Sequence, residues 1–270
     1  MIFPSEAPLD AKRKKAGDVD GVQIKERKDG SWIVKVDRSE AEKPDPAPLE
    51  ETQRAVRNSE EAQIKQELQT QTITPASTDV PVGTQSYIWH MTRGDESSSS
   101  SGHIVEFGGQ DYDTSAEEAT AATLGTVGWG AMTRSSWIGT PFRGTGSGTQ
   151  SATVTAYGDY NGFMVTAGSG SFSADVEFVL QNLSTNAEWS TTIYQNSGSL
   201  LGGHVTGETN YTASVHPEIR AGDDYLAYTR LETSVNLTGG ADCSSDFGPQ
   251  DGDDAPKGQG VGLYYIGIDF

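Results

Sequence analysis

The sequence is short of the residues that build disulfide frameworks, cysteine-rich metal sites and membrane spans. Cys243 is the one cysteine among 270 residues, which excludes a disulfide framework within the chain and a zinc site made of several cysteines. No hydrophobic run approaches the ~20 residues of a membrane helix. The segment 1–15 places its basic residues after a very short apolar stretch, the reverse of the order in a signal peptide. We therefore expect a soluble chain that carries no signal peptide.

Lysine is scarce in the larger part of the chain. Residues 1–70 hold 13 Lys and Arg against 15 Asp and Glu, whereas residues 71–270 hold 6 against 23, and Lys257 is the only lysine after Lys65. A surface with this excess of carboxylates repels phosphate, so we expect no binding to nucleic acid. Carboxylates in place of lysines also keep a protein hydrated in concentrated salt. The composition therefore favours a protein of a halophile.

Motifs for catalysis are also missing. No Gly-Lys-Ser/Thr phosphate loop and no Gly-x-Ser-x-Gly nucleophile elbow occurs. The adjacent carboxylates Glu117-Glu118 and Asp223-Asp224 would suit a glycan hydrolase, but an acidic composition supplies such pairs by chance. The sequence therefore predicts that the chain is not an enzyme and has no catalytic residues. The histidines do not have the spacing of a zinc protease site; they are His90, His103, His204 and His216.

The first 84 residues differ in composition from the rest, and we expect them to form an N-terminal arm. An Asp29-Gly30 pair between two β-prone segments predicts a hairpin over residues 22–37. A proline-rich spacer follows, and residues 49–69, which contain no Gly or Pro, predict a helix with one thin apolar stripe. We expect this arm to mediate anchoring, with residues 1–84 contacting other copies of the chain and other proteins.

Residues 85–270 show β-strand patterns almost throughout. The clearest is residues 172–180, in which apolar residues alternate with polar ones. Only residues 116–123 suggest a helix in this region, and residues 97–101 and 139–148 suggest loops. The fold class predicted is mainly β, an antiparallel, jelly-roll-like β-sandwich behind the N-terminal arm. The expected strands are 87–91, 104–107, 151–157, 162–167, 172–181, 188–195, 210–216, 225–237 and 261–270.

Two groups of residues are candidates for binding. Five carboxylates in a Gly- and Pro-containing segment could supply oxygen ligands to calcium, although their spacing is not that of an EF-hand; they are Asp242, Asp246, Asp251, Asp253 and Asp254. Aromatic residues could line a sugar-binding face, although aromatics of a β-sandwich mostly belong to its core. The aromatic candidates are Trp89, Trp129, Trp137, Trp189, Tyr157 and Tyr160.

Two segments, 221–230 (AGDDYLAYTR) and 262–270 (GLYYIGIDF), together with the acidic, lysine-poor β region, resemble virion structural proteins of haloarchaeal viruses. The resemblance implies a capsid, spike or turret protein that assembles inside the cell and resides in the virion as an oligomer. Under this hypothesis, removal of residues 1–70 leaves a folded sandwich that no longer enters particles. The alternatives are a host-attachment or carbohydrate-binding module of a halophile and, third, a glycan hydrolase.

Overall fold

A computed structural model describes residues 22–26, 32–36, 47–70, 78–239, 242–248 and 260–270. Within these residues the chain is mainly β-strand with a single helix, so the predicted fold class, a β-sandwich with a helix in the N-terminal region, is confirmed. The elements are β1 (Val22–Glu26), β2 (Trp32–Val36), α2 (Ala47–Thr70), β3 (Thr78–Pro81), β4 (Ser86–Ile88), β5 (Arg93–Phe107), β6 (Gln110–Asp113), β7 (Glu118–Thr145), β8 (Thr149–Ser151), β9 (Thr153–Asn182), β10 (Glu188–Val215), β11 (Glu218–Arg220), β12 (Asp224–Gly239), β13 (Asp242–Phe247) and β14 (Gly260–Asp269).

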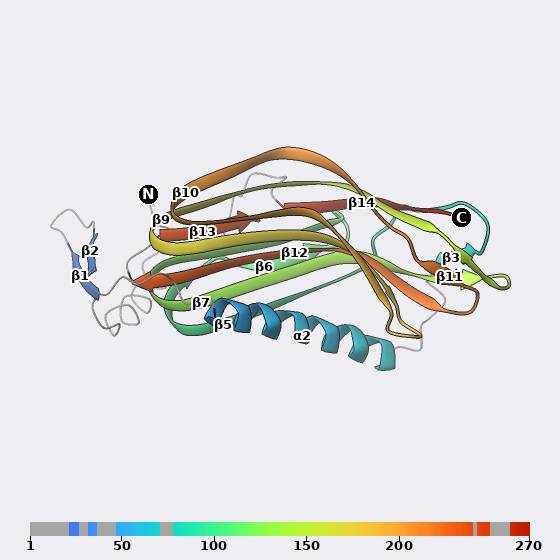
Figure 1. Cartoon of the computed structure of the whole chain (residues 1–270), viewed down its shortest axis with the longest axis horizontal. Coiled ribbons are helices and arrows are strands. Elements are labelled where there is room, and N and C mark those ends of the chain that lie inside the picture. Colours follow the sequence, from blue (N-terminus) through green and yellow to red (C-terminus); the bar gives the residue numbers. More distant parts are fainter. Residues whose placement is uncertain (1–21, 27–31, 37–46, 71–77, 240–241, 249–259) are drawn as a thin grey trace.

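The large sheet is built on very long strands that run along the long axis of the molecule (Figure 1). Strands β10, β9, β12 and β7 lie in that order. Strands β13 and β14 each pair with both β7 and β9. They therefore take the place of β12 between those two strands where β12 has ended. On its other side β7 pairs with β5 and β6 in antiparallel and with β3 in parallel orientation. A separate two-stranded sheet joins β8 and β11.

One face of the large sheet forms the main hydrophobic core. Residues 172–180 alternate as predicted, with Phe172, Val176 and Phe178 among the buried side chains of this core. Burial of apolar surface from strands at both ends of the chain contributes about 25 cal/mol per Å² to folding. Because β14 contributes Val261, Leu263, Ile266 and Ile268 to the same core, the last strand is an integral part of it.

The expected helix over residues 116–123 is wrong. Strand β7 begins at Glu118, and Ala119, Ala121 and Ala122 are fully buried. Alanine favours helix in isolation, but here its small side chain lets neighbouring strands pack closely, and tertiary packing overrides the propensity. The expected loop over residues 97–101 is likewise wrong because these residues belong to β5, and the segment 139–148 is strand as far as Thr145.

Glycines explain why β7 has no clear strand pattern. Gly128 and Gly130 have φ of +131° and +140°, a region that favours glycine. A Cβ at either residue would lie 2.0 Å from a carbonyl oxygen of β5, that of His103 or Ser101 respectively. These glycines therefore serve the close pairing of β5 with β7, although in the sequence they resemble a loop.

Both predicted elements of the N-terminal segment are present. β1 pairs with β2 in the expected hairpin, and α2 spans the expected helix with one or two further residues at each end. The helix lies against the large sheet of its own chain, on the face opposite to the main core (Figure 1). Its Ile64 packs in a second cluster with Trp137 and Tyr228. In the part of the chain that the structure describes, no helix has the length and apolar character needed to cross a membrane.

Candidate functional site

Four aromatic side chains gather on the outer surface near β4 and β14. The ring of Tyr265 lies between those of Trp89 and Tyr157, with ring centroids 4.6 Å and 4.3 Å away and the Tyr157 ring nearly parallel. Tyr87 lies beside them, 6.3 Å from the Tyr265 centroid. Trp89 is 57% exposed and Tyr87 48% exposed. We call Tyr87, Trp89, Tyr157 and Tyr265 the aromatic cluster.

Strand pairing brings these four residues together from three distant parts of the sequence. Ile88, the last residue of β4, is buried between Tyr87 and Trp89, and the rings of both neighbours are exposed on the outer side. Tyr265 of β14 pairs directly with Tyr157 of β9. Gly267, two residues after Tyr265, pairs with Tyr87, and the Tyr87 ring lies 3.4 Å from where a Cβ of Gly267 would be. The Tyr87 ring therefore packs directly over Gly267 on this face of the sheet.

Polar side chains continue the same face beside the rings. The Gln85 amide donates to the Tyr87 hydroxyl, 2.8 Å away, and to the Asp269 carboxylate. Thr155 and Thr153 share the outward face of β9 with Tyr157, since side chains two residues apart lie on one face. The Thr155 hydroxyl is 2.9 Å from that of Ser214, and the Thr153 hydroxyl is 3.2 Å from His216 Nδ1. The aromatic cluster thus adjoins a strip of hydroxyl, amide, imidazole and carboxylate groups.

The charge around the aromatic cluster is mainly negative. His90, next to Trp89, lies 3.9 Å from a carboxylate oxygen of Glu117. Partial burial raises the pKa of the Glu117 carboxyl, an effect that His90 opposes. The pKa of Tyr157 is raised, first by desolvation and then by the neighbouring Tyr265 and Asp269. The Tyr157 hydroxyl therefore stays protonated at neutral pH and can donate a hydrogen bond.

The structure places some of the aromatic residues predicted from the sequence on the surface and others in the protein core. Trp89 and Tyr157 come together in the cluster, whereas Trp137 is fully buried beneath α2 and Trp189 packs against the main core. The sequence analysis missed Tyr87 and Tyr265. The alternation Tyr87-Ile88-Trp89 was the available signal, because two aromatics flanking an apolar residue in a strand share the opposite face. The remaining candidates are Trp129, which is half-buried, and Tyr160, which packs on Tyr194.

The calcium candidates are only partly described. Asp242 and Asp246 lie on β13, four residues apart, which in an extended strand is ~13 Å. Asp251, Asp253 and Asp254 lie outside the described residues. Among the described residues, no group of three His, Cys, Asp or Glu side chains is placed to hold a metal ion, and calcium binding by the full set stays a prediction.

The adjacent carboxylates considered for hydrolysis have structural partners. Asp223 accepts a hydrogen bond from the Asn182 amide, 2.9 Å away, and Asp224 lies 3.9 Å from Arg143. Desolvation raises the pKa of Glu118, and so do the nearby Asp159 and Asp113. Glu117 precedes the strand and Glu118 begins it.

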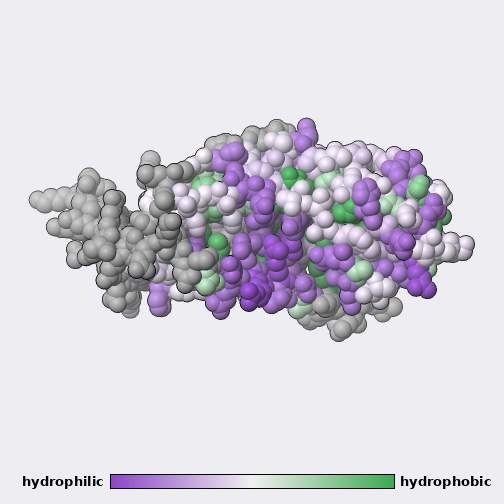
Figure 2. All heavy atoms as spheres, in the orientation of Figure 1, coloured by the Kyte–Doolittle hydropathy of each residue, from purple (hydrophilic) through white to green (hydrophobic). Residues whose placement is uncertain are grey.

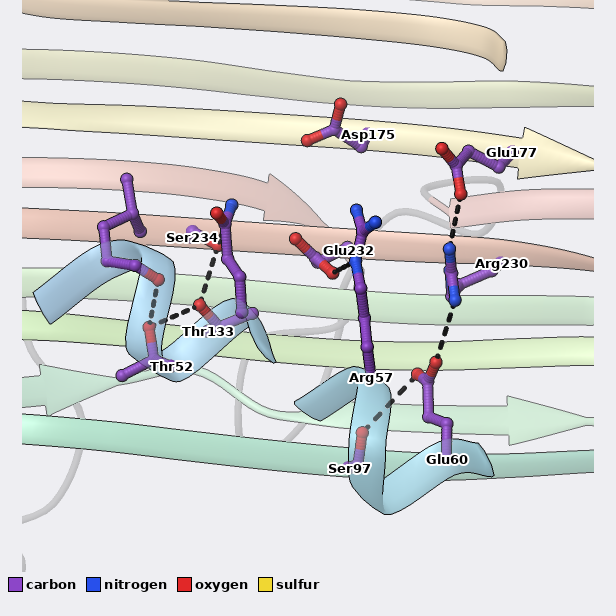
Figure 3. Close-up of polar contacts among 12 residues, drawn as sticks. Thr52, Arg57, Glu60, Ser97, Thr133, Asp175, Glu177, Arg230, Glu232 and Ser234 are labelled. Atoms are coloured by element: carbon purple, nitrogen blue, oxygen red, sulfur yellow. Dashed lines mark hydrogen bonds and ion pairs between the residues drawn. The ribbon is translucent and has the colours of Figure 1, made fainter. Parts of the chain in front are cut away.

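A second group of polar residues lies between α2 and the sheet (Figure 3). Arg230 bridges Glu60 of the helix, 3.3 Å away, and Glu177 of β9. Arg57 Nε is 3.2 Å from Glu232. Thr133 connects the hydroxyl groups of Thr52 and Ser234, each 2.9 Å away. We call these residues the helix–sheet polar cluster. These contacts and the thin apolar stripe that includes Ile64 hold the helix on the sheet. The outer surface of the molecule around α2 is strongly hydrophilic (Figure 2).

Burial makes the acidic members of this cluster weak acids. Desolvation raises the pKa of Glu232 from 4.5 to about 6, although Arg57 and Arg230 oppose the shift. Desolvation also raises the pKa of Glu60, against the opposing charge of Arg230, and it raises the pKa of Asp175. In each case the folded protein holds its proton more tightly than the unfolded chain does.

We therefore expect the free energy of unfolding to fall as the pH rises from 4.5 to about 6. When a carboxyl has a higher pKa in the folded protein than in the unfolded chain, its contribution to stability is full below the unfolded-state pKa. The contribution is lost as the pH rises through the folded-state pKa. The Glu232 shift corresponds to about 2 kcal/mol. Urea unfolding at several pH values measures this, and Glu232→Gln is expected to reduce the slope, with Glu60 and Asp175 supplying the remainder. Equal slopes in the wild type and Glu232→Gln would contradict the assignment to this residue.

Comparison with known proteins adds no family. No protein-family model matches the chain, and no curated protein matches it. Among solved structures, the enzymatically active domain of tailspike protein 4 of bacteriophage CBA120 has 9% identity and a TM-score of 0.19, covering 63% of this chain and 19% of that chain. TmCBM61 in complex with β-1,4-galactotriose has 12% identity and a TM-score of 0.17, covering 56% of this chain and 83% of that chain. Likenesses this weak assign no role to this chain.

Proposed function

We propose that this chain is a carbohydrate-binding β-sandwich, which uses the aromatic cluster to attach to a glycan-bearing surface. The observation that carries the proposal is the exposure of Trp89 and Tyr87 beside the Tyr265 and Tyr157 rings. Large aromatics exposed together on one surface are costly unless a partner covers them. A pyranose ring presents a face of C–H groups with partial positive charge, which the negative face of an aromatic ring attracts.

The polar strip supplies what a sugar needs besides an apolar contact. Sugar hydroxyls both donate and accept hydrogen bonds, and the strip offers the Gln85 amide, the Asp269 carboxylate and the Thr153 hydroxyl for both roles. A few convergent polar groups beside aromatic rings fix the orientation of a small ligand. The carboxylates nearby and the net charge of −19 disfavour anionic ligands. The surface therefore suits a neutral glycan.

The wider role expected from the virion resemblance stays a prediction. A surface protein of a particle and a free carbohydrate-binding module would both use the aromatic cluster in the same way. The absence of enzymatic activity and the location in a virion also stay predictions. Copy number in purified particles, counted by mass spectrometry, separates a shell protein from a sparse attachment protein.

Replacement of Trp89 is expected to abolish most of the glycan affinity. The full chain is screened on an array of neutral and acidic glycans, and the best neutral ligand is titrated by tryptophan fluorescence. Trp89→Ala should weaken binding by about tenfold or more, about 1.4 kcal/mol, as truncation of a central aromatic contact does. Because Trp89 is more than half exposed, the variant should keep its melting temperature.

Tyr264→Ala is the matched control for this experiment. Tyr264 lies on β14 next to Tyr265 and is 43% exposed, but its ring is not part of the aromatic cluster. We expect Tyr264→Ala to bind the glycan as the wild type does. Failure of the wild type to bind any neutral glycan, or equal affinity of both variants and the wild type, would refute the proposal.

A further inference from the structure

Strand β10 forms one edge of the large sheet. It is 28 residues long and pairs with β9 along its length, and no other described strand pairs with it. In Figure 1 it lies at the outer margin of the molecule. An edge strand presents backbone N–H and C=O groups on its outer side that can pair with another strand.

The β10 edge lacks the charges that proteins commonly place on an open edge. Residues 189–207 contain no Asp, Glu, Lys or Arg and no proline, whereas charged residues and proline are the usual means of preventing edge-to-edge pairing. The edge strand on the other side of β7 differs, because β5 carries Arg93, Asp95, Glu96 and Glu106 and is in contact with α2. The sheet therefore has one charged, covered edge and one long, neutral edge.

The net charge of −19 indicates where two copies of this chain can meet. Most of the surface repels the same surface of a second copy, since residues 71–270 hold 23 Asp and Glu against 6 Lys and Arg. Residues 189–207 of β10 carry none of these charges; the nearest carboxylate is that of Asp175 on β9, which accepts a hydrogen bond from Gln195. The register of β10 on β9 shifts at three places, between Thr192 and Tyr194, between Ser199 and Leu201, and between Thr206 and Thr209. The segment 194–199 between the first two shifts is regular and has the usual length of a strand.

We propose that β10 is the dimer interface of this protein, in which segment 194–199 pairs in antiparallel orientation with the same segment of a second copy. Antiparallel pairing of one segment with itself has a two-fold axis, so the contact is closed and makes a dimer. Gln195, Ser197 and Ser199 are exposed along this segment and meet their counterparts across the axis. Pairing continues the sheet from one copy into the next and satisfies the outer backbone groups of both.

The test is the mass of the full chain in solution, measured by sedimentation velocity for the wild type and Ser197→Glu. We expect the wild type to be a dimer of 28.8 kDa chains. Ser197→Glu places two like charges near the two-fold axis and should raise the dimer dissociation constant by about tenfold or more. Thr149→Glu adds the same charge at an exposed residue of β8 and should leave the dimer intact.

A charge-reversal pair makes the test specific to this segment. Ser197→Glu mixed with Ser197→Lys should form a mixed dimer, because the opposite charges attract across the axis, while each variant alone is mainly monomer. Melting curves check that the variants fold. A monomeric wild type at the highest attainable concentration, or a Ser197→Glu protein that dimerises as the wild type does, would overturn the proposal.

Discussion

Removal of residues 1–70 is expected to destabilise the sandwich severely, whereas removal of residues 1–46 should leave its stability nearly unchanged. The longer truncation deletes α2 and exposes Trp137, Tyr228 and the other side chains of the second cluster to water. It also removes Arg57 and Glu60, which leaves Glu232 and Arg230 without their helical partners. The lost apolar burial favours the unfolded chain.

The expected size of this effect is large. Each fully buried apolar side chain that loses its cover contributes about 1.5–3 kcal/mol, and several side chains of the second cluster lose their cover together. The longer truncation should therefore lose at least about 5 kcal/mol, and in a chain of this size the melting temperature should fall by about 10–20 °C. Melting curves of the two truncated chains and the full chain in one buffer measure it.

This expectation differs from the one based on the sequence alone, in which the sandwich folds without residues 1–70. A truncation of residues 1–70 that melts at the same temperature as the truncation of residues 1–46 would show that α2 does not contribute to the stability of the sheet.

Arg230→Met is expected to be the most damaging single substitution in the helix–sheet polar cluster. Arg230 is the shared partner of Glu60 and Glu177, and its loss leaves two carboxylates close together with little access to water. Breaking a buried ion pair in this way costs about 3–5 kcal/mol. Thermal unfolding should show a fall of about 6–20 °C. The loss should be smaller near pH 5 than near pH 8, because burial raises the pKa of Glu60 and a protonated Glu60 carboxyl does not repel Glu177.

Two further variants separate the buried charge from simple loss of an arginine. Arg143→Met breaks an ion pair with Asp224 that is half exposed on the arginine side and should cost less than about 1 kcal/mol. Adding Glu60→Gln and Glu177→Gln to Arg230→Met should recover most of the lost stability, since the neutral amides remove the unpaired charges. If Arg230→Met and Arg143→Met were equally mild, the buried bridge would contribute little to the attachment of α2.

The aromatic cluster and the β10 edge lie on different parts of the large sheet and call for separate tests. Rings of the cluster come from β4, β9 and β14, whereas the proposed dimer segment is the stretch of β10 around Ser197. Paired copies would each carry an aromatic cluster. Two linked glycan sites increase the apparent affinity for a surface that bears many glycans without any new contact.

The sequence by itself determined the features that depend on neighbours along the chain. Alternation over residues 172–180, the Asp-Gly hairpin signal at residues 29–30 and the Gly- and Pro-free segment 49–69 indicate a strand, a hairpin and a helix, and the described residues show the strand, the paired strands of the hairpin and the helix. These patterns are readable because a strand repeats every two residues and a helix every 3.6. The mainly β class followed from the same periodicities.

Only the tertiary structure decided the rest. It extended β7 through the alanines of residues 119–122 and the glycines at 128 and 130, whose local preference is not for strand. It placed Tyr87 against Gly267 and Tyr265 against Tyr157, and it laid α2 on the chain's own sheet. The physical reason is that the register between strands far apart in sequence is set by burial and backbone pairing across the whole sheet. No local pattern records which residues those long-range contacts bring together.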